Sequence, residues 1–170
     1  MSASPGSGVH DLMAMAAGPW VIIDDGVMGG RSAGNVREED DRFVFYGNLS
    51  LQNNGGFSSM RLPLNQGLDG YSGIRITVRG DGRVYQLRLR HGSRFDGVSW
   101  VREFVSSDVW MTLDIPFKDF RPGFRGRSVP RAGPVIPEDV RQIGILLGDK
   151  NPGPFRLEIK AIEGLKATSS

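Results

Sequence analysis

The sequence predicts an all-β domain, a sandwich or jelly roll of antiparallel sheets, and three observations support this. The 170 residues include 24 glycines, about twice the average usage of roughly 7%, which is typical of many tight turns between short strands. Short segments of alternating or continuous apolar residues recur along the chain. Almost no helical periodicity separates them, so parallel βαβ units are disfavoured.

The expected strands follow one another from Trp20 onward. They are residues 20–23, 43–51, 57–64, 73–80, 84–90, 98–105, 111–115, 143–147 and 155–162. In 73–80 and 84–90, apolar and polar residues alternate, so one face of each strand is expected to pack in the core. The pair Asn54-Gly55 tolerates positive φ, which predicts that 43–51 and 57–64 form a hairpin.

The chain is predicted to contain one domain. Residues 1–17 are expected to be an N-terminal arm with one short helix over 10–17, residues 18–165 a jelly-roll domain, and residues 166–170 a disordered tail. The proline- and arginine-rich stretch 117–137 predicts a long irregular loop, and loops of that length often carry function.

Composition argues against several classes of function. A net charge of +2 does not favour binding to nucleic acid or to anionic membranes. The chain has no cysteine, which excludes thiol nucleophiles and thiolate metal sites. No apolar run approaches the ~20 residues that span a bilayer. With no basic residue before Arg31 there is also no transit-peptide pattern, so a cytoplasmic location is expected.

Catalytic motifs receive little support. The run GRSAG over 30–34 matches the G-x-S-x-G pattern of serine hydrolases, but no helix signal follows it, and His10 and His91 lie far apart in the sequence. Glu103 and Glu158 could act as paired carboxylates only if the fold brought them together. We therefore predict a binding protein and assign no catalytic residue.

A calcium ion is a further hypothesis. Asp24 and Asp25 precede a glycine, and Asp149 lies in another expected loop, so carboxylates and carbonyls could surround a cation there. The commoner role of aspartate beside glycine is to accept hydrogen bonds from local backbone amides, and we favour that interpretation. We expect no cofactor.

Arginine placement gives the strongest candidate site. The chain has 17 arginines and 4 lysines, and arginine is suited to planar, bidentate recognition. Six arginines lie at strand positions whose side chains should point to the face opposite the apolar residues: Arg61, Arg75, Arg79, Arg88, Arg90 and Arg102. If their strands share a sheet, these residues form one docking surface, with Trp100 available to stack on a sugar ring. The alternative is a solvated face whose arginines pair with Asp and Glu.

Several motifs resemble the complex I intermediate-associated protein family, an assembly-factor family for NADH:ubiquinone oxidoreductase. They are DDGVMGGRS over 24–32, GNLSL over 47–51 continuing through NNGGF over 53–57, GDGR over 80–83, RGR over 125–127 and GPFRLEI over 153–159. Together they extend over nearly the whole chain. The resemblance implies a galactose-binding-like jelly roll and a non-catalytic role.

This resemblance makes a protein-binding assembly factor or chaperone-like module our leading hypothesis, with complex I subunits or other assembly factors as partners. The alternative is a carbohydrate-binding module that uses the arginine and tryptophan face. Within the motifs, Asp25, Arg31, Asn53 and Asn54 are expected to form a polar network at one rim of the sandwich. This network either holds two loops together, which we favour, or binds a ligand.

Overall fold

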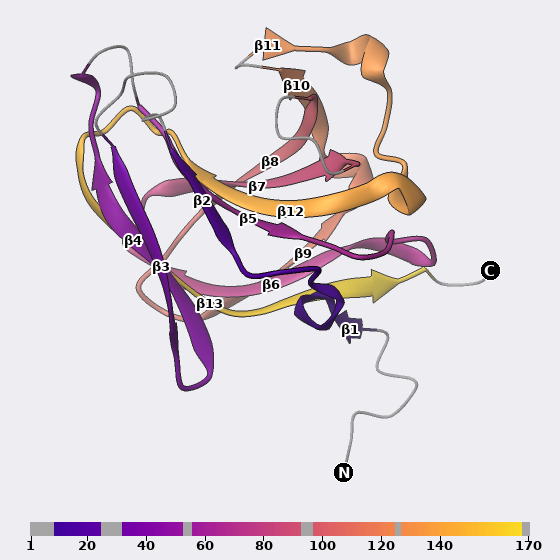
Figure 1. Cartoon of the computed structure of the whole chain (residues 1–170), viewed down its shortest axis with the longest axis horizontal. Helices are drawn as coiled ribbons and strands as arrows, with labels where there is room; N and C mark the ends of the chain where they lie inside the picture. Colours follow the sequence, from indigo (N-terminus) through magenta and orange to yellow (C-terminus); the bar gives the residue numbers. More distant parts are fainter. Residues whose placement is uncertain (1–8, 25–31, 53–55, 93–96, 125–126, 168–170) are drawn as a thin grey trace.

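The computed structural model describes residues 9–24, 32–52, 56–92, 97–124 and 127–167. Within these ranges, strands and short 3-10 helices form a β-sandwich without an α-helix (Figure 1). The strands divide between two antiparallel sheets, which we name the β13 sheet and the β12 sheet after a central strand of each. The all-β sandwich expected from the sequence is confirmed.

The β13 sheet is built around the longest strand of the described chain. Its strand order is β3 (Ala33–Glu39), β4 (Arg42–Leu49), β13 (Gly153–Lys166), β6 (Tyr71–Gly80) and β9 (Met111–Pro116). The first part of β13 pairs with β4, and its last residues pair with β1 (Val9–Asp11). β13 therefore has two different partners along one of its edges, β4 near its start and β1 near its end.

The β12 sheet carries the arginine-rich strands. Its strand order is β11 (Arg127–Ser128), β10 (Arg121–Phe124), β8 (Ser99–Val105), β7 (Val84–His91), β12 (Val140–Leu147), β5 (Ser58–Pro63) and β2 (Val21–Asp24). Residues 142–147 of β12 are all buried, although alternate residues of a strand point to opposite faces. The outward-pointing side chains at the centre of this sheet are therefore buried as well as the inward-pointing ones.

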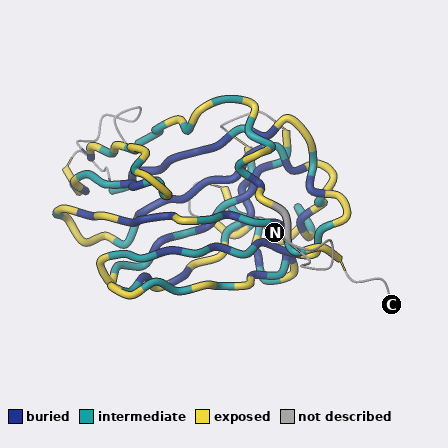
Figure 2. Tube along the Cα trace, turned by 90° about the horizontal axis from the view of Figure 1, so that it is seen from below, coloured by how far each residue is buried: buried dark blue, intermediate teal, exposed yellow. Residues whose placement is uncertain are grey.

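The core lies between the two sheets, where the buried positions of facing strands meet (Figure 2). The alternation seen in the sequence of β6 and β7 places one face of each strand there, because side-chain direction reverses at every residue. The side chains so placed are fully buried: Ile74, Ile76, Val78, Tyr85, Leu87 and Leu89.

The predicted hairpin of 43–51 with 57–64 is wrong. β4 pairs with β3 and β13 in one sheet, whereas β5 pairs with β12 and β2 in the other. β4 and β5 thus lie in different layers of the sandwich. Both strands bury apolar side chains, and alternation alone indicates which face is buried but not which strand is adjacent.

The N-terminal region belongs to the domain from residue 9 onward. β1 pairs with β13, with Val9 opposite Leu165, and Leu12 is fully buried. The short helix expected over 10–17 is a 3-10 turn, η2 (Leu12–Met15), and Asp11 caps it by accepting a hydrogen bond from the Met13 amide at 2.9 Å. The separate arm expected over 9–17 is therefore part of the sandwich.

The stretch expected to be a long loop is more regular than predicted. It contains β10 and β11, which extend the β12 sheet beyond β8. Three single-turn 3-10 helices complete it: η5 (Phe117–Asp119), η6 (Pro130–Ala132) and η7 (Pro137–Asp139). Proline at the first turn of η6 and η7 costs no hydrogen bond, because that amide has no partner inside a helix.

Candidate functional site

The six predicted arginines do not share one face. Arg75 and Arg79 lie on β6 in the β13 sheet, whereas the other four lie on strands of the β12 sheet. The single docking surface expected from strand parity is therefore wrong. Parity separates inward from outward positions within one strand, and the two sheets of a sandwich have outer faces on opposite sides of the molecule.

The two arginines of the β13 sheet are ion-paired. Arg75 Nε donates to Asp114 at 2.6 Å. Arg79 Nε donates to Glu158 at 2.8 Å, and the Arg79 guanidinium lies over the Trp110 ring at 4.7 Å from its centroid. These hydrogen bonds to carboxylates raise the pKa of Arg75 and of Arg79. For Arg75 and Arg79, the alternative interpretation therefore holds, in which outward arginines pair with Asp and Glu.

Trp100 and Arg102 point away from the other arginines of their sheet. Trp100 pairs with Leu89, and Arg102 with Leu87, so both follow the core-facing parity of β7. Trp100 is 4% exposed, and its indole Nε1 donates to the Gly133 carbonyl at 3.0 Å. Arg102 is exposed and donates to the backbone carbonyl of Glu103. Trp100 is therefore not available to stack on a sugar.

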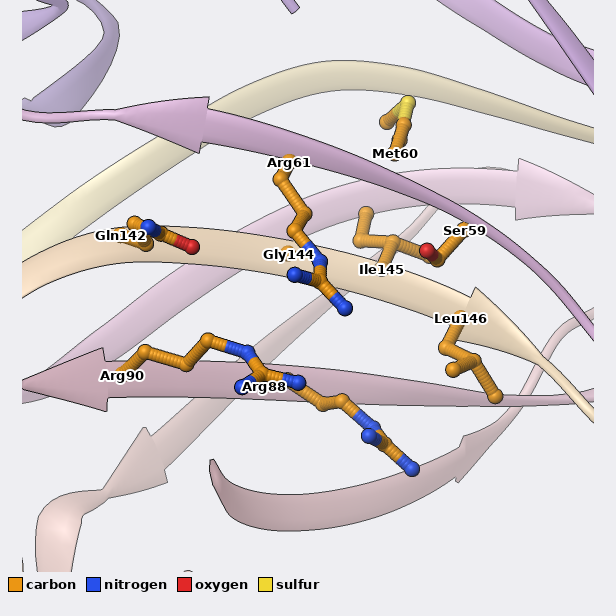
Figure 3. Close-up of a pocket in the computed structure, with 9 residues that line it drawn as sticks. All are labelled: Ser59, Met60, Arg61, Arg88, Arg90, Gln142, Gly144, Ile145 and Leu146. Atoms are coloured by element: carbon orange, nitrogen blue, oxygen red, sulfur yellow. The ribbon is translucent and has the colours of Figure 1, made fainter. Parts of the chain in front are cut away.

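Arg61, Arg88 and Arg90 are the predicted arginines that the structure brings together. They lie on the outer face of the β12 sheet, where Arg61 extends from β5 across β12 toward β7 (Figure 3). We call the site that they line the arginine pocket. Its lining residues are Ser59, Met60, Arg61, Arg88, Arg90, Gln142, Gly144, Ile145 and Leu146.

Strand register produces this arrangement. Gly144 of β12 pairs with Arg61 on one side and with Arg88 on the other, so the three residues form one row across the sheet. Gln142 pairs with Arg90 in the neighbouring row. Directly paired residues point to the same face, and here that face is the outer one.

Gly144 leaves room for the Arg61 side chain to lie across β12 (Figure 3). A Cβ atom at this position would lie 3.2 Å from the Met60 carbonyl oxygen and 3.5 Å from Cγ of Arg61. A glycine inside a strand often marks a place where another group approaches the backbone closely. Sequence reasoning missed both Gly144 and Gln142, because β12 reads as a continuous apolar segment.

The pocket concentrates positive charge in a partly desolvated place. Arg61 is 9% exposed and Arg90 is 8% exposed. Burial, followed by the positive charges of Arg90 and Arg88, lowers the pKa of Arg61 to about 10. Burial and the charge of Arg90 likewise lower the pKa of Arg88 to about 10. Both guanidiniums remain cationic at neutral pH.

The hydrogen bonds of Arg88 go to neutral oxygens. Its Nε and Nη2 donate to Gln86 Oε1 at 2.8 and 2.6 Å, and its Nη1 donates to Ser99 Oγ at 3.3 Å. Among the residues the structure describes, no carboxylate lies within 4.0 Å of this guanidinium. Arg90 donates to the Gly97 carbonyl at 2.7 Å. The arginine pocket thus differs from the ion-paired face of the β13 sheet.

The pocket is small and is suited to binding. Its cavity of about 10 Å³ has room for a group the size of one water molecule. Ser59 supplies its hydroxyl, but that hydroxyl donates to the Ile23 carbonyl at 2.5 Å. No histidine or carboxylate is among the described residues that line it.

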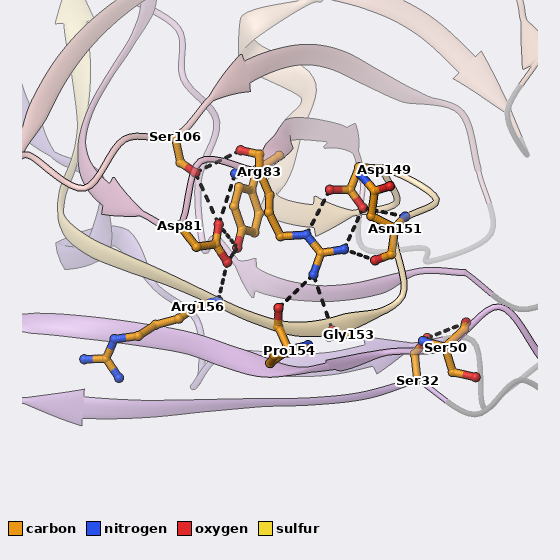
Figure 4. A network of polar contacts seen from close by, with 11 residues as sticks. Ser32, Ser50, Asp81, Arg83, Ser106, Asp149, Asn151, Gly153, Pro154 and Arg156 are labelled. Carbon is orange, nitrogen blue, oxygen red and sulfur yellow. Dashed lines mark hydrogen bonds and ion pairs between the residues drawn. The ribbon is translucent and has the colours of Figure 1, made fainter.

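A second polar cluster lies at one end of the sandwich (Figure 4). Arg83 binds both carboxylate oxygens of Asp149, at 2.9 and 2.8 Å, and also donates to the Pro154 carbonyl. Burial of Asp149 opposes its ionisation, but hydrogen bonds from Arg83 and Asn151 outweigh this and lower the pKa of the carboxyl. Asp149 is thus held by an arginine in this structure, which we did not predict.

Asp81 belongs to the same cluster. Its carboxylate accepts hydrogen bonds from the Tyr85 hydroxyl at 3.1 Å and from the Arg156 amide at 2.8 Å. Asp24, the other aspartate of the calcium hypothesis, accepts from the Gly34 amide at 3.4 Å. In the described part of the chain, no group of three or more His, Asp or Glu residues is placed to hold a metal ion.

The predicted rim network of Asp25, Arg31, Asn53 and Asn54 lies outside the described residues. The positions that flank it are linked across the two segments. Ser32 Oγ donates to the Ser50 carbonyl at 3.1 Å and accepts from the Ser50 amide at 2.9 Å (Figure 4). Ser32 therefore connects the two flanking segments.

Residues 12–159 match the family model described as complex I intermediate-associated protein 30. This chain belongs to that family. Within the complex I intermediate-associated protein 30 family, the mitochondrial protein of Mus musculus is 27% identical over 166 residues, which cover 84% of this chain and 51% of that protein. A probable mitochondrial member from Caenorhabditis elegans is 31% identical over 149 residues, which cover 75% of this chain and 44% of that protein.

The chain thus spans about half the length of these curated relatives of the complex I intermediate-associated protein 30 family. Both are named as mitochondrial proteins. This finding contradicts the cytoplasmic location expected from the sequence, and that expectation is wrong. Helices long and apolar enough to cross a bilayer are absent from the residues described.

Solved structures similar to this family member include carbohydrate-binding modules. The family 11 module of a cellulosomal cellulase of Clostridium thermocellum aligns with a TM-score of 0.74 and 16% identity, covering 96% of this chain and 97% of the module. A structure of a family 11 module from the same organism with a mixed-linked tetrasaccharide aligns with a TM-score of 0.66 and 15% identity, covering 89% and 91%. At such identities the likeness shows the fold alone, and it confirms the galactose-binding-like jelly roll.

Proposed function

We propose that this chain is a non-catalytic, protein-binding module that takes part in the assembly of respiratory complex I, and that the arginine pocket contacts its partner. Membership of the complex I intermediate-associated protein 30 family carries the proposal. The partner is a subunit of complex I or another of its assembly factors. A chaperone-like role follows, in which the sandwich holds a partner without changing it chemically.

The geometry of the arginine pocket supports a binding role. Its cations lie on a rigid sheet, and rigid placement reduces the entropy lost when a partner docks. Arg88 has neutral hydrogen-bond partners, so a charged group of another molecule gains a strong interaction there. The carbohydrate-binding hypothesis loses its stacking residue, because Trp100 is buried and hydrogen-bonded to Gly133.

Affinity capture from cells that contain complex I, but lack their own copy of this gene, tests the proposal. The tagged chain should recover identified complex I subunits or assembly factors, and cells without it should accumulate less mature complex I on native gels. Normal complex I in the deletion strain, together with capture of no respiratory protein, would overturn the proposal.

A matched pair of variants locates the contact. Arg88→Met removes a cation from the arginine pocket, whereas Arg75→Met removes one from the opposite sheet, where Arg75 pairs with Asp114. We expect Arg88→Met to reduce capture of the partner and Arg75→Met to retain it. Equal capture by both variants would place the contact elsewhere on the chain.

A further inference from the structure

A second basic region lies apart from the arginine pocket. The stretch 117–137 contains Lys118 and four arginines, and its single acidic residue is Asp119. Net charge averages over the whole molecule, so the value of +2 does not describe this region. Its described cations lie at one edge of the β12 sheet, where β10 pairs with β8 and β11 pairs with β10 (Figure 1). We name the following residues the basic edge: Lys118, Arg121, Phe124, Arg127 and Arg131.

Backbone contacts bring the basic edge together. Arg121 Nη1 donates to the Lys118 carbonyl at 2.9 Å. Arg127 pairs directly with Phe124 between β11 and β10, so these two side chains point to the same face as neighbours. The 3-10 helix η6, which contains Arg131, follows β11 and contacts β10.

The four cations of the basic edge are exposed. Within the described part of the chain, none of them lies within 4.0 Å of a carboxylate oxygen. The outer face of the β13 sheet differs, because Arg75 and Arg79 pair there with Asp114 and Glu158. An anionic surface would therefore gain more from the basic edge than from that face.

The cations point to both faces of the sheet edge. Arg121 pairs with Val101, which pairs with Arg88, so Arg121 lies on the outer face. Phe124 and Arg127 lie on the other face, because Phe124 is three residues farther along β10 and side-chain direction reverses at each residue. A partner lying flat on the outer face would reach Arg121 but not Arg127. A broad surface that meets the edge of the sheet would reach both.

Phe124 places an apolar group, 38% exposed, among these cations. A bilayer interface suits this combination, because a ring can enter the boundary between headgroups and acyl chains while cations stay among the headgroups. At about 3.3 Å per residue, Arg121 lies roughly 10 Å from Phe124 along β10. Interfacial apolar groups are buried to a similar depth of ~5–10 Å. An acidic protein surface would bind the cations but offers no such apolar layer to the ring.

We propose that the basic edge binds the surface of a bilayer that contains anionic phospholipids. Its lysine and three arginines contact the lipid headgroups, and Phe124 enters the interface beside them. The contact is peripheral and reversible, because a few cations and one ring supply the attraction. It requires no protein partner, so it is independent of the proposed assembly role.

Co-flotation of the purified full chain with lipid vesicles measures this binding. One set of vesicles contains phosphatidylcholine with about 30% phosphatidylserine, and the other contains phosphatidylcholine alone. We expect binding to the anionic vesicles to be at least about tenfold stronger at ~0.1 M salt, and to be largely lost at about 0.5 M salt.

Two pairs of substitutions locate the contact. Arg121→Gln with Arg127→Gln removes two cations from the basic edge. Each cation near an anionic membrane changes the affinity roughly fivefold, so this double variant should bind on the order of 25-fold more weakly. Arg37→Gln with Arg156→Gln makes the same change in net charge at side chains of the β13 sheet that are 47% and 45% exposed. This control should stay within about twofold of wild type.

Phe124→Ser separates the contribution of the ring from that of the charges. It should weaken binding to the anionic vesicles on the order of tenfold and leave the salt dependence in place. Thermal unfolding checks the fold of every variant, and midpoints within a few degrees of wild type are expected for exposed positions. If the arginine double variant unfolded, Lys118→Gln with Arg131→Gln would make the same test on the same edge.

Three results would overturn the membrane contact. They are equal binding to the two kinds of vesicle, equal loss of binding in the two arginine double variants, and binding of fluorescent oligouridylate or tetraglutamate with none to the anionic vesicles. The last result would assign the basic edge to RNA or to an acidic protein. Because the vesicles contain no protein, failure here would leave the proposed assembly role untouched.

Discussion

Arg61 and Arg88 flank Gly144 in one row across three strands, on the outer face of the β12 sheet. The spacing of that row is fixed by backbone hydrogen bonds on both sides of β12. The two guanidiniums are therefore held near each other by the sheet, although burial, followed by the charges of Arg90 and Arg88, lowers the pKa of Arg61. Such placement is expected of a binding site that trades stability for function.

Replacing the central glycine should weaken binding without unfolding the chain. In Gly144→Ala the new methyl group lies 3.2 Å from the Met60 carbonyl oxygen, which is a tight contact, and 3.5 Å from Cγ of Arg61, so it fills space in the row between the two arginines. Alanine suits a strand better than glycine by roughly 0.5–1 kcal/mol, which offsets crowding against the Met60 carbonyl. We expect an unfolding free energy within about 1 kcal/mol of wild type and roughly threefold or greater loss of partner capture.

Urea titration and affinity capture of the complex I partner measure these two quantities for Gly144→Ala. Gly18→Ala is the matched control, because its Cβ would meet only Pro63 Cγ, at an ordinary contact distance of 3.8 Å. Unchanged capture of the partner by Gly144→Ala would show that the partner does not contact the row between the arginines.

The Arg83 and Asp149 ion pair should stabilise the end of the sandwich. Their side chains are 13% and 9% exposed, and Arg83 also donates to the backbone carbonyls of Gly153 and Pro154 at the start of β13. Arg83→Met leaves the Asp149 carboxylate buried without its cation, so we expect a loss of about 3 kcal/mol in unfolding free energy. Exposed Arg37 pairs with Glu39, and Arg37→Met should cost less than about 1 kcal/mol by the same urea titration.

Glu158 should make the unfolding free energy depend on pH in the acidic range. The hydrogen bond from Arg79, then the charges of Arg79, Arg42 and Arg156, lower the pKa of this carboxyl. A lowered pKa means that the stabilisation is complete above the usual value of about 4.3 and is lost as pH falls through the folded value. At pH 7, Glu158→Gln should reduce the unfolding free energy by about 1 kcal/mol, because its arginine partners are largely solvated.

Urea titrations at several pH values check this dependence on Glu158. The difference between wild type and Glu158→Gln should shrink as the pH falls below 4. A constant difference between pH 7 and pH 3 would contradict the lowered pKa.

His91 should contribute a second pH dependence. Its Nε2 accepts a hydrogen bond from the Ile136 amide at 3.1 Å, and its ring lies 4.0 Å from the Trp100 ring, centroid to centroid. Burial lowers the pKa of His91, although Asp139 opposes this. The associated stabilisation is therefore complete above about pH 6.5 and is lost as pH falls below it, at no more than about 1.4 kcal/mol per pH unit.

Unfolding free energies between pH 7.5 and pH 5 measure the contribution of His91. His91→Gln keeps an acceptor oxygen and cannot titrate, so its stability should vary less with pH than that of the wild type. An unchanged slope in His91→Gln would show that His91 is not its source.

The alternation of apolar and polar residues predicted which side chains are buried, but it did not predict which strands pair. The inward residues of 73–80 and 84–90 were identified correctly, because the two-residue period of a strand follows from backbone geometry. The same period says nothing about which strands are adjacent. For this reason the predicted hairpin of 43–51 with 57–64 and the single arginine face were wrong.

The sequence predicted part of the candidate site. Arg61, Arg88 and Arg90 were predicted to face outward, and they do. Trp100 was misplaced because residues 98–105 are apolar at both parities, which leaves the inward side undetermined. Nothing in the sequence distinguished Gly144 from other strand residues. Its role depends on the arginines that the strand register places on either side of it.

Because β1 pairs with the last residues of β13, Val9 lies opposite Leu165. The polypeptide thus enters and leaves the sandwich side by side, in the β13 sheet (Figure 1). The arginine pocket lies in the β12 sheet, so a tether or neighbouring domain attached at the two ends of the described chain would start from the other layer of the sandwich.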